Sequence, residues 1–266
     1  MSKEEFQEII WENGRRLYRD MPWRTDTRPY YVLVSELMLQ QTQVDRVIPK
    51  FNDFIAQFPD ETSLANAPLA DVLILWSGLG YNRRAKFLHD SAKKITTEFN
   101  GAFPKNYTDI LSLPGVGPGT AGAILTYAYN KVAPFIETNV RTVYFHHFFP
   151  DGEKTSDEQL KVIVAQTLDH ENPREFYWAL MDYGTWLKKN GAGKITQSKH
   201  YKKQAPLKGS VRELRGLLMK HLSRTDAKFS ALQEQYGDDP RFTRALDGLI
   251  ADGLIVRTDE ILHLTK

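Results

Sequence analysis

A single glutamate in an apolar helical segment is the first residue of this sequence placed to do acid–base chemistry. The neighbours of Glu36 along the chain are Val32, Leu33, Val34, Leu37, Met38 and Leu39. Burial among such side chains disfavours a charged carboxylate and raises its pKa, so we expect Glu36 to keep its proton near neutral pH. A protonated carboxyl group is suited to general acid catalysis. The alternative is an ordinary carboxylate on the polar face of the helix.

A glycine-rich turn between two helical patterns is suited to bind a phosphate group. It has the sequence Leu113-Pro114-Gly115-Val116-Gly117-Pro118-Gly119-Thr120. Its alternating glycines allow left-handed backbone angles and let a phosphate oxygen approach main-chain N–H groups. We expect the next helix to begin near Thr120, so that its free N–H groups face the same point. Such a contact carries no information about the base.

Positive charge is concentrated in one segment, although the net charge of the chain is only +2. Between Tyr183 and Arg224 there is one acidic residue, Glu213, and there are eleven basic residues: Lys188, Lys189, Lys194, Lys199, Lys202, Lys203, Lys208, Arg212, Arg215, Lys220 and Arg224. Such clustering is typical of contact with a phosphate backbone, and a solvated basic linker is an equally good interpretation. Arg83, Arg84 and Lys86 are further candidates for phosphate contacts or for a solvated helix face.

Cysteine is absent, which excludes disulfides, thiolate nucleophiles and cysteine-ligated zinc or iron–sulfur centres. His146, His147 and His200 do not form a metal-binding pattern. The N-terminal residues are typical of a charged amphipathic helix, and no apolar stretch approaches the about 18 residues of a membrane span. We therefore expect a cytoplasmic protein with no cofactor, no metal and no membrane contact.

Helices must position these groups. Helical periodicity and Gly, Pro and Asx punctuation predict an all-α body, with helices over 44–58, 63–66, 69–78, 83–99, 107–111, 120–130, 139–148, 158–168, 173–187 and 210–222. Residues 191–209 are basic and rich in Gly and Pro, which predicts a linker. Residues 210–266 predict three helices and a hairpin with strands 254–257 and 261–264. This arrangement is typical of a small winged-helix module, either a binding unit or a structural cap.

Several motifs resemble those of adenine DNA glycosylases of the helix-hairpin-helix (HhH-GPD) superfamily, in the same order and over roughly residues 20–190. The hairpin string around Gly115 and Gly117 is the signature of this superfamily. The run Leu37-Met38-Leu39-Gln40-Gln41-Thr42-Gln43-Val44 distinguishes it from pyrimidine-directed relatives such as endonuclease III. The other matching motifs are Pro22-Trp23-Arg24, Pro29-Tyr30, Ala65-Asn66-Ala67-Pro68-Leu69, Leu75-Trp76, Gly78-Leu79-Gly80-Tyr81 and Thr120-Ala121-Gly122-Ala123-Ile124.

The resemblance implies a two-lobed helix-hairpin-helix fold. A six-helix barrel (25–130) would pack against a helical domain (1–24 and 131–190), with the active site between them, followed by the basic linker (191–209) and the winged-helix-like module (210–266). Relatives carry four cysteines for a 4Fe–4S cluster after the segment that matches Met181-Asp182-Tyr183-Gly184. This chain resembles a variant without the cluster, and we expect basic side chains to take over its electrostatic role. The domain that usually recognises 8-oxoguanine is replaced by the module.

The resemblance also implies the catalytic roles. Glu36 matches the general acid, and Asn139 matches an asparagine that hydrogen-bonds catalytic carboxylates or water. Glu137 stands where relatives have Asp, which stabilises the positive charge that develops on the sugar. The longer side chain leaves two interpretations: the same chemistry in an adjusted pocket, or a weakened or redirected enzyme.

Other matching positions contact DNA in the relatives. Gln40, Gln41 and Thr42 match residues that fill the gap left by a flipped base and contact the opposite base. Tyr81 matches an aromatic wedge, or packs on Trp76. Trp23 and Arg24 match residues of the adenine pocket. Trp178 replaces a Gln or Glu near the extruded base, and it either stacks on a base or belongs to the core.

The resemblance implies a monomeric, monofunctional DNA glycosylase of base excision repair. Gly119 stands where lyase-active relatives have Lys, so no Schiff-base lyase activity is expected. The expected substrate is a mispaired purine in double-stranded DNA, above all adenine opposite guanine or 8-oxoguanine. The alternatives are another base, such as hypoxanthine or mismatched thymine, and a catalytically weak lesion-binding protein.

Overall fold

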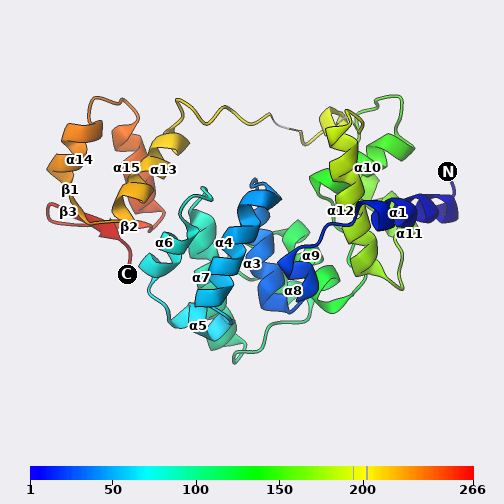
Figure 1. Ribbon diagram of the computed structural model, residues 1–266, viewed down its shortest axis with the longest axis horizontal. Coiled ribbons are helices and arrows are strands. Elements are labelled where there is room, and N and C mark those ends of the chain that lie inside the picture. Colours follow the sequence, from blue (N-terminus) through cyan, green and yellow to red (C-terminus); the bar gives the residue numbers. More distant parts are fainter. Residues whose placement is uncertain (194, 202) are drawn as a thin grey trace. The chain divides into compact units, whose positions relative to one another are not determined.

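The computed structural model describes residues 1–193, 195–201 and 203–266, and most of them are helical (Figure 1). Lys194 and Lys202, two residues of the basic segment, lie outside the described residues. Contacts divide the chain into two compact units: unit 1 is Met1–Val32, Lys105–Ser112 and Val116–Lys203, and unit 2 is Leu33–Pro104, Leu113–Gly115 and Gln204–Lys266. This division differs from the four predicted segments, because the C-terminal residues group with Leu33–Pro104. The four-segment description stays a prediction.

Unit 1 is built around two long helices whose glycines allow close packing. Its elements are α1 (Lys3–Leu17), α2 (Pro22–Thr25), the start of α3 (Pro29–Leu39), α8 (Tyr107–Leu111), α9 (Pro118–Tyr129), α10 (Thr138–Phe148), α11 (Asp157–Thr167), α12 (Pro173–Lys189) and the short 3-10 helix η1 (Ile195–Gln197). A Cβ at Gly14 of α1 would lie 2.5 Å from the Cβ of Ala179 in α12. A Cβ at Gly184 of α12 would lie 2.5 Å from the carbonyl oxygen of Asn139 in α10. Both positions therefore need glycine.

The first part of unit 2 contains most of α3, α4 (Val44–Gln57), α5 (Glu61–Asn66), α6 (Leu69–Trp76) and α7 (Arg83–Glu98). On α4 the apolar residues predicted by periodicity face inward, and Val47, Phe51 and Phe54 are buried. The ring of Phe54 meets that of fully buried Trp76 edge-on at 6.2 Å. The side chain of Asp60 caps α5 by accepting from the N–H of Ser63 at 2.7 Å.

The second part of unit 2, residues Gln204–Lys266, is called the C-terminal module below. It consists of α13 (Val211–Leu222), β1 (Ala227–Lys228), α14 (Phe229–Tyr236), α15 (Phe242–Ala251), β2 (Ile255–Thr258) and β3 (Ile261–Leu264) (Figure 1). The strands form one antiparallel sheet in the order β1-β3-β2, with Ile255 opposite Leu264 and Ala227 opposite Leu262. The predicted three helices and hairpin are confirmed. The sequence did not predict β1, which is only two residues long.

Part of the predicted linker is packed. Gln197 and Ser198 are buried, and the Gln197 side-chain amide donates to the carbonyl of Phe149 at 2.8 Å. The backbone of Thr155 pairs on both sides of this site, donating to Gln197 and accepting from Lys199 at 3.1 Å each. Polar side chains and main-chain bonds hold this segment, so its burial left no apolar pattern in the sequence.

The sequence predicts neither a membrane-spanning helix nor a group of metal-binding side chains. Within the described residues, no helix is both long and apolar enough to cross a membrane. In the same part of the chain, no three His, Asp or Glu side chains lie together in a way that could hold a metal ion.

Candidate functional site

Glu36 lies near the end of α3, on a strongly apolar helix. Its neighbours Ser35 and Leu37 are 1% and 0% exposed, whereas Glu36 is half-buried. The helix ends at Leu39, and Gln41 has a left-handed backbone (φ +57°), which turns the chain after Gln40. A non-glycine residue in this region is uncommon and often marks a functional position.

Arg84 of α7 fixes this end of α3, and the expectation of a phosphate contact for it is wrong. The residue is only 6% exposed. Its Nη1 atom donates to the carbonyl oxygens of Leu37, Met38 and Gln40 at 2.7, 2.9 and 2.7 Å. Carbonyl groups at the end of a helix lack partners within it and carry partial negative charge, so a cation is favourable there. Burial lowers the pKa of Arg84 to about 10, which still leaves it charged at neutral pH.

Arg84 also holds the turn that carries Tyr81. Its Nη2 atom donates to the Thr42 hydroxyl at 3.2 Å and to the Gly80 carbonyl at 3.0 Å. The turn has left-handed angles at Gly78 (+96°), Gly80 (+74°) and Tyr81 (+48°). The guanidinium of Arg84 lies over the rings of both Trp76 and Tyr81, at 5.4 and 5.5 Å. Unit 2 therefore brings Gln40, Thr42 and Tyr81 together around one buried cation.

The glycine-rich hairpin needs Gly115 for two reasons. Gly115 has φ +77°, and a Cβ there would lie 2.7 Å from the Cβ of Phe87. The other two glycines do not have left-handed angles. Gly117 is extended (φ −92°), and Gly119 lies inside α9. Of these three glycines, which all allow left-handed angles, only Gly115 adopts one.

The N-terminus of α9 exposes main-chain donors. The helix begins at Pro118 rather than near Thr120, with Gly117 as its N-cap and no side-chain cap. Proline has no N–H, so Gly119 and Thr120 carry the N–H groups that lack a partner within the helix. A Cβ at Gly117 or Gly119 would meet nothing within 4 Å, which leaves space for an approaching anion.

Glu137 is the N-cap residue of α10 in unit 1, and its side chain makes no capping bond. Burial of the carboxyl group raises the pKa of Glu137, and the nearby charge of Arg141 opposes this shift. Arg141 is one turn further along α10 and is held by Asp157, with Nη2–Oδ2 and Nε–Oδ1 distances of 2.5 and 2.8 Å. The group is therefore a carboxylate in a poorly solvated place with one tethered cation nearby.

Asn139 lies two residues after Glu137 and has an unused acceptor. Its Nδ2 atom contacts the sulfur of Met181 at 3.6 Å. Its Oδ1 atom is buried, and no donor among the described residues reaches it. Buried polar atoms are nearly always paired, so this oxygen is placed to accept a hydrogen bond from a ligand or a water molecule.

Trp178 of α12 is half-buried between an aromatic ring and a cation. It stacks with Tyr127 at 6.4 Å, and the guanidinium of Arg24 lies 5.4 Å from its ring centre. Trp23 is 7% exposed and Arg24 is 6% exposed. Asp182 holds Arg24 through two bonds of 2.7 and 3.1 Å, so Arg24 supports the Trp178 face rather than offering a free charge.

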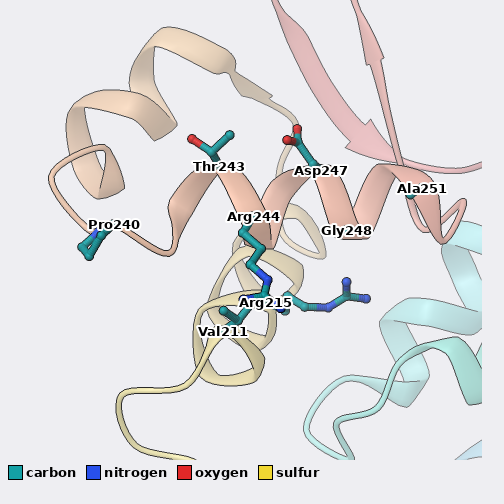
Figure 2. A pocket seen from close by; sticks show the side chains of 8 residues that line it. All are labelled: Val211, Arg215, Pro240, Thr243, Arg244, Asp247, Gly248 and Ala251. Atoms are coloured by element: carbon teal, nitrogen blue, oxygen red, sulfur yellow. The ribbon is translucent and has the colours of Figure 1, made fainter.

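A separate groove of about 680 Å³ lies on the C-terminal module between α13 and α15 (Figure 2). It is lined by Val211, Arg215, Pro240, Thr243, Arg244, Asp247, Gly248 and Ala251. None of the residues predicted for the site lines it. Sequence reasoning missed the roles of Arg84 and Asp182 in the site, because the sequence shows only helical charges without their distant partners.

Residues 34–166 match the family described as HhH-GPD superfamily base excision DNA repair protein. The adenine DNA glycosylase of Mycobacterium tuberculosis (strain CDC 1551 / Oshkosh) is 33% identical, over 92% of this chain and 88% of the relative. That of Buchnera aphidicola subsp. Acyrthosiphon pisum is 38% identical, over 69% of this chain and 54% of the relative. The chain thus spans about half the length of the Buchnera relatives that it matches.

Two solved structures share the fold. A thermostable thymine-DNA glycosylase superposes with a TM-score of 0.62 at 24% identity, covering 68% of this chain and 85% of that one. An endonuclease III trapped as a covalent intermediate with DNA superposes with a TM-score of 0.57 at 16% identity, covering 77% and 91%. At these identities the likeness concerns the fold.

Proposed function

The chain belongs to the HhH-GPD superfamily of base excision DNA repair proteins, and from this premise we propose that it is an adenine DNA glycosylase. It acts as a monomer on double-stranded DNA and removes adenine mispaired with guanine or 8-oxoguanine. The observation that carries the proposal is the placement of Glu36. This glutamate is half-buried near the end of α3, and Arg84 fixes that end beside the Tyr81 turn.

In the proposed reaction the bond between C1′ of the sugar and the base nitrogen breaks, and its electron pair leaves with the base. Glu36 donates a proton to a ring nitrogen of adenine, which makes the base a better leaving group. Ionised Glu137 stabilises the positive charge on the sugar, as the second carboxylate does in glycoside hydrolysis. The free Oδ1 atom of Asn139 orients a water molecule, which adds to C1′ and loses a proton to the Glu36 carboxylate, giving free adenine and an abasic site.

We propose that the enzyme leaves the DNA strand intact. Position 119 is glycine, so no amine is available there to form a Schiff base with the sugar. Strand cleavage should appear only after alkaline treatment of the product. We also propose that no iron–sulfur cluster is involved, because such clusters are held by cysteine thiolates and this chain has none.

A second candidate is removal of another base, such as hypoxanthine or mismatched thymine. Trp178 favours it, because indole can stack on a base but cannot accept a hydrogen bond from the adenine amino group. The half-buried ring stacks on Tyr127, and an aromatic surface of this kind accepts several bases because every base has a π-face.

A panel of duplexes tests the proposal. Each carries one central pair, A:8-oxoguanine, A:G, hypoxanthine:T, U:G or T:G, and alkaline cleavage follows single-turnover incubation. We expect cleavage at adenine in the first two duplexes. Release of hypoxanthine or thymine without adenine would favour the second candidate, and DNA binding with no release from any duplex would indicate a lesion-binding protein.

The charge of Arg141 should set the acid limb of the pH profile. Glu137 acts ionised, so release slows as pH falls through its pKa, which burial raises and Arg141 lowers. In Arg141→Gln the pKa of Glu137 rises further, and we expect the acid limb to move to higher pH. Single-turnover rates measured across pH check this.

Asp157→Asn is the matched control for that shift. It breaks the same ion pair but leaves the positive charge of Arg141 in place. We expect its acid limb to stay or to move to lower pH. If both variants moved the limb in the same direction, the broken ion pair rather than the charge would be responsible, and the role assigned to Glu137 would be wrong.

A further inference from the structure

The C-terminal module is fixed to the start of α7. Asp252, at the end of α15, pairs with Arg215 of α13 at 2.5 Å and with Arg83 of α7 at 3.5 Å. Arg215 passes α15 at Gly248, where a Cβ would lie 2.5 Å from its Nη1 atom (Figure 2). At Gly253 the backbone approaches Lys86, with only 3.3 Å between a Cβ there and the lysine Cε. The module therefore has a defined place beside the Tyr81 turn.

Two residues of the module bind the Tyr81 hydroxyl. Arg212 donates to it from Nη1 at 2.6 Å and lies over the Tyr81 ring at 5.3 Å. The side-chain amide of Gln204 also donates to this hydroxyl, and its second hydrogen goes to Oε1 of Gln41 at 2.7 Å. One amide thus connects Tyr81 and Gln41, which both have left-handed backbone angles.

These bonds determine which hydrogen-bonding capacity is left for a ligand. A phenol hydroxyl has two acceptor sites and one hydrogen to donate. Arg212 and Gln204 occupy both acceptor sites, and in the described part of the chain no acceptor takes the hydrogen. The Oε1 atom of Gln41 accepts from Gln204, which leaves its NH2 group to donate. Both side chains therefore present donors.

We propose that Gln204 and Arg212 are positioning residues that make Tyr81 and Gln41 hydrogen-bond donors, so that the enzyme prefers a base with keto oxygen acceptors opposite the excised adenine. Guanine offers O6 and N7 as acceptors at its major-groove edge. A base with an amino group in place of O6 offers a donor at that edge instead. This inference rests on the proposed function, in which Tyr81 and Gln41 contact the opposite base.

The charge of Arg212 supports a role beyond packing. Arg212 is half-buried, and no carboxylate in the described part of the chain pairs with it. Arg215, one turn further along the same helix, is neutralised by Asp252. An arginine side chain has only hydrogen-bond donors, so in its bond with Tyr81 the hydroxyl oxygen must be the acceptor.

The test compares two opposite bases of the same size. Adenine is placed opposite guanine or opposite 2,6-diaminopurine, which carries an amino group in place of O6. Single-turnover release and equilibrium binding by fluorescence anisotropy are measured for both duplexes. Gln204→Glu replaces the amide donor by an acceptor of the same shape. The Tyr81 hydroxyl must then donate its hydrogen to the new carboxylate rather than to the opposite base. We expect the guanine preference to fall about tenfold, the size of one neutral hydrogen bond.

Three further variants complete the test. Arg212→Met should also lower the preference, whereas Lys220→Met removes the same charge from an exposed position on the same helix and should leave it unchanged. Gln235→Glu adds the same charge as Gln204→Glu at an exposed position on α14 and should also preserve it. Tyr81→Phe keeps the ring but removes one of the two donors, so in this background Gln204→Glu acts through Gln41 alone and should change the preference less than in the wild type.

The inference and the proposed function fail in different ways. If the wild-type protein released no adenine, the function would be wrong, and the binding preference would still decide the inference. An unchanged preference in Gln204→Glu, or equal slowing on both duplexes, would overturn it. Additive effects of Gln204→Glu and Tyr81→Phe would do the same.

Discussion

Adenine release by the Glu36→Gln variant is expected to be about 10³-fold slower than by the wild-type protein, with DNA affinity unchanged. Glutamine has nearly the shape of protonated glutamic acid and keeps an oxygen and a donor in place, but it has no proton to transfer. The helix around it is held by fully buried Leu33, Leu37 and Met38, so this change should not alter the fold.

The measurement is single-turnover release from the A:G duplex, together with anisotropy binding to the same duplex. Glu98→Gln is the matched control, since it makes the same change on an exposed side chain at the end of α7. Release by the control should equal that of the wild type. Persisting release by Glu36→Gln would show that another group supplies the proton, and a loss of affinity would show that Glu36 binds DNA rather than acting as the acid.

Local signals in the sequence predict the frame of this site well. The helical pattern after the glycine-rich turn predicts α9, although the helix begins at Pro118 rather than near Thr120, and the apolar run around Glu36 predicts a buried helix. Gly115 is predicted because its need for a left-handed angle arises within its own turn. These features depend on residues that are close along the chain.

The polar connections could not be predicted, because their partners are distant along the chain. In the sequence Arg84 has the pattern of a solvated helix residue, yet it is buried by carbonyl groups more than forty positions earlier. Gln204 lies in a segment with the composition of a linker, and its partners Gln41 and Tyr81 belong to another part of unit 2. Nothing in residue type or periodicity marks such pairs before the chain is folded.

Asp182 is the centre of a buried ion-pair cluster in unit 1. Its side chain is 1% exposed, and it binds Arg24, 2% exposed, at 2.7 Å and Arg19 at 2.6 Å. It also accepts from the backbone N–H of Arg19 at 3.2 Å. Through Arg24 this cluster supports the ring of Trp178. Removing the carboxylate leaves a buried guanidinium without its counter-ion.

We therefore expect Asp182→Ala to lower the free energy of unfolding by about 3–5 kcal/mol, as for other broken buried ion pairs. Urea unfolding followed by far-UV circular dichroism measures this change. Asp26→Asn is the control: it breaks the pair between Asp26 and Arg28, whose side chains are 38% and 54% exposed, and should cost at most about 1 kcal/mol. A loss of similar size in both variants would contradict a special role for burial.

The double variant Arg24→Met with Asp182→Leu separates stability from function. Replacing both charges by apolar side chains removes the unpaired cation, and such replacements are often close to neutral. Most of the lost stability should therefore return, whereas the Trp178 ring loses its cation, so adenine release should be slower than in the wild type. If release recovered together with stability, the cluster would serve the fold alone. If stability did not recover, the uncompensated charge of Arg24 would not be the cause of the loss.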